Sequence, residues 1–290
     1  MRSKKRNNNG LKIFVSILAI LVIGILGYIY SIYANVKDSM DTAYTPVEVE
    51  TFRTSNTGTV ADSSEDEESR TNAGAMTPSE LLEAGEPVSI LLLGVDTGDL
   101  GRTEQGRSDS MVVVTINPHT QKTTLLSIPR DTYTEIVGYG TSDKINHAYA
   151  FGGTAMSINT VQQMLDIPID FYVMVNMAGI QEIVDAVGGI TVESPLTFNQ
   201  NGYDFVQGTN QLDGEAALAF ARMRYEDPAG DTGRQGRQRL VIEAVIRKLA
   251  TPETLLNYQT ILQSLSSNVQ TSFQLSDFYT LQSQDYLGAV

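Results

Sequence analysis

The stretch VSILLLGV, which runs from Val88 to Val95, opens the part of the chain in which short β-rich segments recur. Eight almost uniformly apolar residues are typical of a strand that is covered on both faces of its sheet. Two further runs, Met111–Asn117 and Thr123–Ile128, follow after Gly, Asp and Pro residues that mark turns. The three runs therefore predict buried strands of one sheet.

Beyond these strands, helical and extended patterns alternate. A helix is predicted at Gly152–Leu165, a strand at Phe171–Val175, and a helix at Met177–Val187 that two glycines would close. Alternation of this kind favours helices on both sides of a central sheet, so we predict an α/β domain over residues 88–290 with three layers, α-β-α. Four more helices are predicted in its second half: Gly214–Met223, Arg237–Leu249, Pro252–Leu265 and Ser276–Leu287.

The N-terminus has the pattern of a membrane anchor. Residues 13–34 are 22 uncharged, mostly apolar residues, which at ~1.5 Å per residue reach roughly 33 Å, enough to cross the hydrocarbon core. A cleaved signal peptide is the alternative, but its apolar region is shorter, about 7–15 residues, and no clear small-x-small site stands near Ala34. Five positive charges precede the stretch and only Lys37 closely follows it. Residues 1–12 are therefore predicted to be cytoplasmic, and the rest of the chain extracytoplasmic.

Residues 35–87 have the composition of a linker. They lack a sustained apolar period, and the acidic run EDEE at residues 65–68 stands among Ser, Thr, Asn and Gly. A segment of this kind buries too little apolar surface to fold by itself. We therefore predict a disordered acidic linker between the anchor and the domain.

The composition of the chain excludes several classes of protein. Among 290 residues, 34 Asp and Glu against 20 Lys and Arg give a formal charge of −14 at pH 7. An acidic protein does not suit nucleic acid, whose phosphates require a basic face. Cysteine is absent, which excludes disulfides, thiol nucleophiles and cysteine-ligated metals. Neither G-x-S-x-G, H-E-x-x-H nor a Walker A motif occurs, which removes the commonest hydrolase, zincin and P-loop interpretations.

The scarce positive charges of the domain are concentrated in one segment. Between Lys144 and Arg222, 77 consecutive residues carry no Lys or Arg, and five arginines then arrive within 18 positions. A guanidinium group can bind two phosphate oxygens at once, so a segment rich in arginine predicts a site for a polyanionic ligand. The alternative is a set of surface ion pairs with Glu226, Asp227 and Asp231. The five residues are Arg222, Arg224, Arg234, Arg237 and Arg239.

The spacing within this segment favours the ligand site. Arg234 and Gln238 are four residues apart at the start of the predicted helix, so they would share one helix face. That face would lie beside a helix N-terminus, which itself attracts anions.

Charged residues also stand at the ends of the predicted strands, where α/β folds usually bind their ligands. Asp96 follows the first strand, Asp109 precedes the second, and Arg130 and Asp131 follow the third after a proline. Carboxylates without His or Cys are suited to Mg²⁺ or Mn²⁺, which predicts a metal site at Asp96 and Asp109. Each aspartate taken alone could equally cap a turn.

The segment Lys144–His147 is less informative. Lys and Asn shortly before a glycine pair are more often solvated loop residues than site residues, so the residues alone favour a loop here. His119 and His147 are the only histidines of the chain, too few for a metal cluster.

Five segments, in this order, resemble the LytR-CpsA-Psr family of Gram-positive cell-envelope proteins. The resemblance covers about residues 88–250 and stands behind a single N-terminal anchor. Five ordered segments are far more specific than any one of them. They are Leu93–Asp96, Arg107–Ser110, Ser127–Asp131, Lys144–Tyr149, and Ala221–Arg224 with its continuation Asp231–Gln238.

The resemblance implies a phosphotransferase with a central mixed sheet, held at the cell membrane by one helix with its domain outside the cell. Such an enzyme moves a glycopolymer from an undecaprenyl-pyrophosphate carrier to a muramic acid hydroxyl of peptidoglycan. The polymer would be wall teichoic acid or a capsular or secondary wall polysaccharide. The product is a phosphodiester, and undecaprenyl phosphate is released.

Positions that match the family's motifs imply roles for single residues. Asp96 and Asp109 resemble its metal ligands, here for Mg²⁺ or Mn²⁺. Four residues are expected to act on the reacting phosphate: Arg130, Arg222, Arg224 and Asp109. The residues that resemble its pyrophosphate-binding set are Arg130, Arg222, Arg224, Arg234, Arg237 and Gln238.

Other hypotheses stay open at this point. The same residues could serve a polyprenyl pyrophosphatase, in which water replaces the sugar hydroxyl. A non-catalytic envelope-binding or regulatory protein is disfavoured as a regulator of transcription, because no basic DNA-reading element exists. The general base is also undecided between Asp109 and Asp131, since a carboxylate that binds a metal is a poor base.

Overall fold

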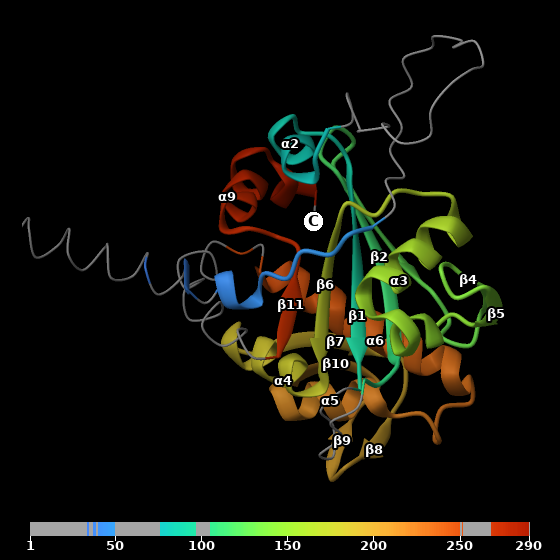
Figure 1. Cartoon of the computed structure of the whole chain (residues 1–290). Coiled ribbons are helices and arrows are strands. Elements are labelled where there is room, and N and C mark those ends of the chain that lie inside the picture. Colours follow the sequence, from blue (N-terminus) through green and yellow to red (C-terminus); the bar gives the residue numbers. More distant parts are fainter. Residues whose placement is uncertain are drawn as a thin grey trace, which may run out of the picture.

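The computed structural model describes residues 34, 37–38, 40–49, 76–96, 105–249, 251 and 268–289 (Figure 1). Apart from Ala34, the predicted membrane span lies outside these residues, as does the helix predicted at Pro252–Leu265. Within the described ranges, no helix is both long enough and apolar enough to cross a bilayer.

A mixed five-stranded sheet forms the centre of the fold. Its strand order is β11-β6-β1-β2-β3, with β1 parallel to β6 and every other neighbouring pair antiparallel. The strands predicted from the apolar runs are confirmed, although β2 begins three residues earlier than expected. The bounds are β1 Val88–Val95, β2 Ser108–Asn117, β3 Lys122–Ser127, β6 Phe171–Asn176 and β11 Val269–Thr271.

Helices pack on both faces of this sheet (Figure 1). Leu91 and Leu93 of β1 face a core shared with the helix α3, His147–Leu165. Val88 and Ile90 point the opposite way, because side chains alternate along a strand, and share a second core. That core is covered by α2 (Pro78–Glu83), α6 (Gly230–Leu249) and the chain end with α9 (Leu275–Ser283) and a 3₁₀ turn at Tyr286–Ala289.

A third core lies beyond α6. Val241 of α6 packs into it, whereas Ile242 and Ile246 pack toward the sheet, so one helix serves two cores. Three phenylalanines, Phe198, Phe205 and Phe220, contact one another at its centre. The elements around it are α4 Met177–Ala186, β7 Ile190–Ser194, β8 Phe198–Gln200, β9 Tyr203–Phe205, β10 Gly208–Leu212 and α5 Gly214–Arg222.

The prediction of a disordered linker over residues 35–87 is wrong for residues 40–49 and 76–87, which the structure describes. Residues 40–49 run along the domain, where Tyr44 bridges to Thr271 and the Tyr172 hydroxyl donates to the Thr45 carbonyl at 2.5 Å. Residues 76–87 contain α2, whose Leu82 is fully buried. Each part has too few apolar residues to fold alone, but each adds them to a core that already exists.

The sharpest break in a helix lies within α3. Gly152 and Gly153 leave helical geometry, and Gly153 adopts φ 66° and ψ −151°, a conformation open almost only to glycine. The predicted start of this helix at Gly152 is thus a kink, and a short segment from His147 precedes it. The kink turns the segment that carries His147 away from the axis of the long helix.

Substitution at the kink should therefore destabilise the fold. Gly153→Ala is expected to lower the free energy of unfolding by about 1–3 kcal/mol, since alanine is strained at this φ and ψ. Gly236→Ala is the matched control, because Gly236 lies inside α6 with no atom within 4 Å of an added Cβ. That change should raise the same quantity by roughly 0.5–1 kcal/mol. Chemical denaturation of both variants measures the opposite signs, and equal effects would contradict the assignment.

Candidate functional site

A β-bulge presents Asp109. Val95 pairs with Ser108 and Gly94 pairs with Ser110, so Asp109 is the extra residue between them. Bulges occur next to active sites because they redirect a side chain out of the regular ladder. Just beyond the bulge, Asp96 accepts a hydrogen bond from the Arg107 backbone N–H at 2.6 Å. The two predicted metal ligands, one just after β1 and the other in β2, therefore stand at the same end of the sheet.

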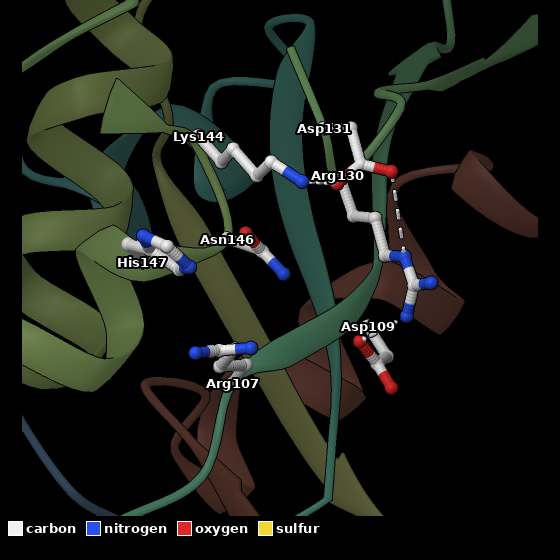
Figure 2. A pocket seen from close by; sticks show the side chains of 7 residues that line it. All are labelled: Arg107, Asp109, Arg130, Asp131, Lys144, Asn146 and His147. Carbon is white, nitrogen blue, oxygen red and sulfur yellow. Dashed lines mark hydrogen bonds and ion pairs between the residues drawn. The ribbon is translucent and has the colours of Figure 1, made fainter. Parts of the chain in front are cut away.

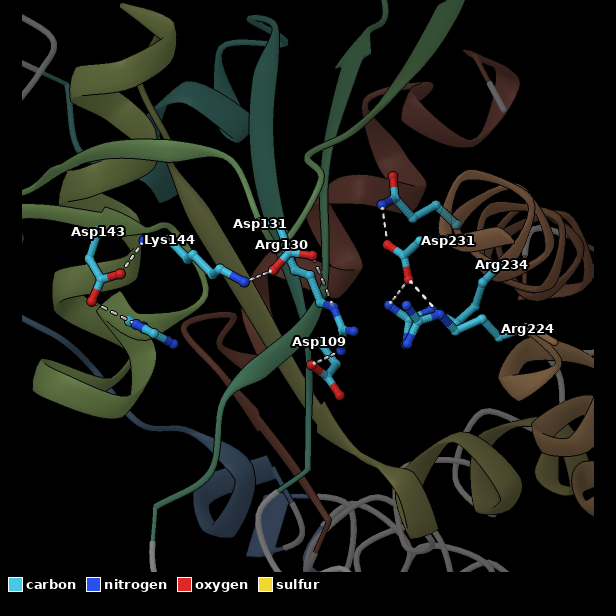
Figure 3. A network of polar contacts seen from close by, with 10 residues as sticks. Asp109, Arg130, Asp131, Asp143, Lys144, Arg224, Asp231 and Arg234 are labelled. Atoms are coloured by element: carbon cyan, nitrogen blue, oxygen red, sulfur yellow. Dashed lines mark hydrogen bonds and ion pairs between the residues drawn. The ribbon is translucent and has the colours of Figure 1, made fainter. Parts of the chain in front are cut away.

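Arg130 is anchored beside this bulge. After β3 ends, Ile128 is buried and the chain turns through Pro129, which brings the Arg130 guanidinium over β2. Arg130 Nη1 donates to Asp109 Oδ1 at 2.8 Å, and the two side chains are 20% and 25% exposed. Asp131 lies 3.9 Å from Arg130 Nε and accepts a hydrogen bond from Lys144 Nζ at 2.7 Å (Figure 3).

The neighbouring charges keep both Arg130 and Asp131 ionised. Burial works against the charged form of Arg130, but Asp109, Asp231 and Asp131 together raise the pKa of Arg130. The hydrogen bond from Lys144 lowers the pKa of Asp131. Both groups are therefore charged at neutral pH, as binding of an anion requires of the arginine.

The α5–α6 connection supplies the other arginines. Arg222 is the last residue of α5 and is half-buried, whereas Arg224 is exposed in the loop that follows. The helix α6 begins at Gly230, seven residues earlier than predicted, so Asp231 and Arg234 occupy its first turns. Arg234 Nη2 lies 2.7 Å from Asp231 Oδ1, and Arg224 Nε lies 3.9 Å from the same oxygen. The Arg234 side chain is only 11% exposed.

The two groups of charges face each other across the end of the sheet. Asp231 of α6 contributes to the raised pKa of Arg130, and burial, followed by the nearby Arg130, lowers the pKa of Arg234. Among the described residues, the buried Nε atoms of Arg130 and Arg234 have no hydrogen-bond acceptor. Two largely buried guanidinium groups that repel each other and are incompletely paired form a place where an anion is favourable.

Arg237 does not belong to this cluster. Its side chain is completely buried, Nε donates to the Phe220 carbonyl at 3.2 Å, and the other two nitrogens donate to Asp227 and the Met223 carbonyl. The structure therefore gives Arg237 a structural role, and its expected place in the pyrophosphate-binding set is corrected. Gln238 follows Arg234 by one helical turn and is partly buried, so it extends the face of α6 that carries Arg234.

A pocket of about 320 Å³ opens beside Arg130. Its wall includes Lys144, the last residue of β5 in the hairpin of β4 (Tyr133–Ile136) and β5 (Thr141–Lys144), and also Asn146 and His147, where α3 begins. The sequence pattern alone favours a loop at Lys144–His147 and does not single out Arg107. The pocket wall consists of Arg107, Asp109, Arg130, Asp131, Lys144, Asn146 and His147 (Figure 2).

Asp96 and Asp109 can complete a metal site only together with oxygen ligands from a substrate. Within the described part of the chain, no three acidic or histidine side chains gather as a metal site would require. One oxygen of Asp109 binds Arg130, and one oxygen of Asp96 accepts a backbone N–H. Mg²⁺ often uses one or two carboxylates and completes its shell with phosphate oxygens and water. Asp96 and Asp109 supply the kind of oxygen ligands that this mode needs.

Comparison with known families decides the affiliation. The family model described as "LytR_cpsA_psr family" matches residues 49–288. This chain belongs to the LytR_cpsA_psr family. The match begins at residue 49, well before Val88, and it includes α2.

Named members of the LytR_cpsA_psr family are close in sequence and in structure. The chain is 46% identical over 273 residues to "Polyisoprenyl-teichoic acid--peptidoglycan teichoic acid transferase TagU" of Enterococcus faecalis, covering 93% of this chain and 82% of that protein. The crystal structure of B. subtilis TagU superposes with a TM-score of 0.57 at 45% identity, over 69% of this chain and 82% of that one. A structure described as "TagT bound to LI-WTA" gives a TM-score of 0.57 at 32% identity, over 70% and 76% of the two chains.

Proposed function

We propose that the chain transfers a glycopolymer from an undecaprenyl-pyrophosphate carrier to a muramic acid hydroxyl of peptidoglycan. The polymer class is wall teichoic acid or another capsular or secondary wall polysaccharide. The observation that carries the proposal is the pair Arg130 and Arg234, whose guanidinium groups are largely buried and incompletely paired at the end of the sheet. The names of the relatives, which are teichoic acid transferases, support the same reaction.

The chemistry needs charge neutralisation and alignment more than a covalent nucleophile. The acceptor oxygen bonds to the phosphorus next to the first sugar of the polymer. The bond from this phosphorus to the oxygen of undecaprenyl phosphate breaks, and that oxygen leaves with the electron pair. Arg130 and Arg234 are placed to bind the pyrophosphate and to stabilise the charge that grows on the leaving group. Arg222 and Arg224 approach from the α5–α6 connection, and Gln238 from the next turn of α6.

A divalent cation belongs to the proposal as well. Asp96 and Asp109 would hold Mg²⁺, or Mn²⁺, together with phosphate oxygens of the carrier. When bound, the ion neutralises phosphate charge and fixes the orientation of the pyrophosphate. The ion pair of Asp109 with Arg130 would then tie the position of the arginine to that of the ion.

The substrate also accounts for the membrane anchor. The carrier is a lipid, so its pyrophosphate lies at the membrane surface. We propose a single-pass anchor at residues 13–34, with residues 1–12 in the cytoplasm and the domain outside the cell membrane. Five positive charges before the apolar stretch support this orientation.

The test uses the full chain in detergent with a lipid-pyrophosphate-linked saccharide, Mg²⁺ and a peptidoglycan oligomer. Mass spectrometry should find a phosphodiester adduct, and a chelator should lower its rate at least about 100-fold, with recovery on addition of Mg²⁺. Asp96→Asn should show the same loss, and Asp170→Asn is the matched control because that carboxylate binds the Ser89 backbone N–H away from the arginines.

Phosphorylated saccharide released without any adduct would instead indicate a pyrophosphatase. Binding of the donor without release would indicate an envelope-binding protein.

A further inference from the structure

The Lys144–His147 side of the pocket carries groups that the donor site does not use. His147 Nδ1 lies 2.7 Å from Asp143 Oδ2, four residues earlier in the chain. Asp143 binds the imidazole, and that hydrogen bond is the largest cause of the lowered pKa of Asp143. A carboxylate on Nδ1 places the proton of a neutral imidazole there and leaves Nε2 as an acceptor. Figure 2 shows the other edge of the ring directed into the pocket.

Next to His147, two aromatic rings form an exposed platform. The rings of Tyr139 and Phe151 stack with centroids 4.0 Å apart and planes 12° apart, and Phe151 meets His147 edge-on at 5.7 Å. Tyr139 stands at the tip of the β4–β5 turn between Gly138 and Gly140, whose φ values of 81° and 75° hold it there. Half of the Tyr139 side chain is exposed. An exposed and ordered stack of rings needs an explanation beyond stability.

A third group lies at the inner end of the pocket. Asn146 is only 4% exposed, and among the described residues its Oδ1 has no hydrogen-bond donor. Its amide points into the pocket between Arg107 and Lys144 (Figure 2). Buried amides are normally fully paired, so a group left incomplete at a pocket wall is one that a ligand can complete. From Tyr139 through His147 to Asn146, exposure decreases toward the donor site.

We propose that this row of residues is the subsite of the acceptor glycan, with Tyr139 and Phe151 stacking against a sugar ring and His147 acting as the general base. The proposal rests on the proposed function, because it assigns the second substrate of the same reaction. The occupant is a peptidoglycan strand, whose sugar rings offer C–H faces for stacking and amide and hydroxyl groups for Asn146. His147 and Asn146 line the same pocket as Arg130, and Phe151 and Tyr139 continue the row outward from His147, so the reactive hydroxyl and the donor phosphorus meet in one space.

The proton transfer balances within this geometry. His147 Nε2 accepts the proton of the acceptor hydroxyl while its oxygen bonds to phosphorus and undecaprenyl phosphate leaves. The imidazolium forms next to Asp143, which stabilises it, and the proton then passes to solvent. Asp143 is a positioning residue, since it acts through the histidine. The base is thus neither Asp109, which is engaged by Arg130, nor Asp131, which is engaged by Lys144.

A binding experiment tests the platform without catalysis. The chain contains no tryptophan, so Tyr139→Trp introduces a single reporter into the full chain. Titration with a peptidoglycan tetrasaccharide should change its fluorescence saturably. Tyr279→Trp is the matched control, because Tyr279 is 48% exposed on α9, and its emission should stay constant. No change at Tyr139→Trp up to millimolar glycan would overturn the subsite, whatever the fate of the transfer reaction.

Kinetics test the base and the platform separately. Tyr139→Ala should raise the acceptor KM at least about 10-fold with the donor KM unchanged, and Tyr139→Phe should restore it. His147→Gln should lower kcat by about 10²–10⁴ with donor binding unchanged, and Asp143→Asn should lower kcat with the acceptor KM unchanged. Wild-type kcat in His147→Gln would overturn the base. If the wild-type chain binds the glycan but forms no adduct, the proposed function fails while the subsite stands.

Discussion

Replacing Arg234 with methionine is expected to remove most of the transferase activity without weakening the fold. Methionine keeps the apolar contacts of the side chain but removes the guanidinium that we propose binds the pyrophosphate. Loss of one preorganised charge donor lowers turnover by on the order of 10²–10³. The effect should fall on kcat more than on the donor KM, since negative charge grows on the leaving group between the bound donor and the transition state.

The expected change in stability on this substitution is opposite to the one that loss of a purely structural residue would cause. Burial, followed by the nearby Arg130, lowers the pKa of Arg234, so the folded state favours the charged form less than the unfolded chain does. At every pH below that lowered pKa the charge therefore opposes folding. Asp231 keeps Gln235 as a hydrogen-bond donor at 3.0 Å after the change. The Tm of Arg234→Met should consequently equal or exceed that of the wild type.

The control for this experiment lies on the same helix. Arg239 is an exposed arginine of α6, and Arg239→Met should leave turnover within about twofold of the wild type, as surface charges usually do. Calorimetry and the adduct assay on both variants separate function from folding. Turnover of Arg234→Met within a few-fold of the wild type, or a clear fall in its Tm, would contradict the role of Arg234.

The sequence predicts the central strands and several of the charges at their ends. Apolar runs such as Val88–Val95 are long enough to allow only a covered strand, and the charged residues that follow them must then stand at the sheet edge. Asp109 and Arg130 meet there for this reason. The concentration of arginine after Arg222 also indicated where the second half of the site would come from. These features depend on local pattern, which a sequence carries.

Other features depend on contacts between distant segments. The bulge at Asp109 is set by the register of two strands, and the folding of residues 40–49 depends on a core made elsewhere. Two local signals in the sequence predict structure that the apolar pattern does not. Thr77 and Glu80 form a capping box that starts α2, and Asn201 and Gly202, both with positive φ, form the two-residue turn between β8 and β9. Both signals stand in segments with few apolar residues, where periodicity is weak.

Arg234 and Arg237 show where a sequence motif fails to predict the role of a residue. Arg234 and Arg237 are three residues apart on one helix, and both resemble the family's pyrophosphate set. Their neighbours separate them, because Arg234 lies at the open end of the sheet while Arg237 points into the α5–α6 connection. The alternative of ion pairs with nearby acids thus holds for Arg237 and Asp227, although that pair is buried rather than on the surface.

Arg237→Met should be the most destabilising of the arginine substitutions. The change leaves Asp227 as a buried unpaired carboxylate and removes donors from the carbonyls of Phe220 and Met223. Breaking one side of a buried ion pair lowers the free energy of unfolding by about 3–5 kcal/mol. For a domain of this size the loss corresponds to a fall in Tm of roughly 10 °C. Calorimetry measures it, with Arg247→Met as the control because Arg247 is 70% exposed in its pair with Glu243.

The double variant Asp227→Asn with Arg237→Met isolates the pair itself. Removing both charges avoids the unpaired carboxylate, so the double variant should be more stable than Arg237→Met alone.

The pH dependence of stability gives an independent check of the Asp227–Arg237 pair. The hydrogen bond from Arg237 lowers the pKa of Asp227, so the pair stabilises the fold above the ordinary aspartate pKa of about 3.9 and loses this effect as the pH falls through the lowered value. The difference in Tm between the wild type and Asp227→Asn should therefore be constant from about pH 5 to 8 and shrink in stronger acid. A difference that persists unchanged in acid would show that packing, rather than charge, holds the α5–α6 connection that carries Arg224.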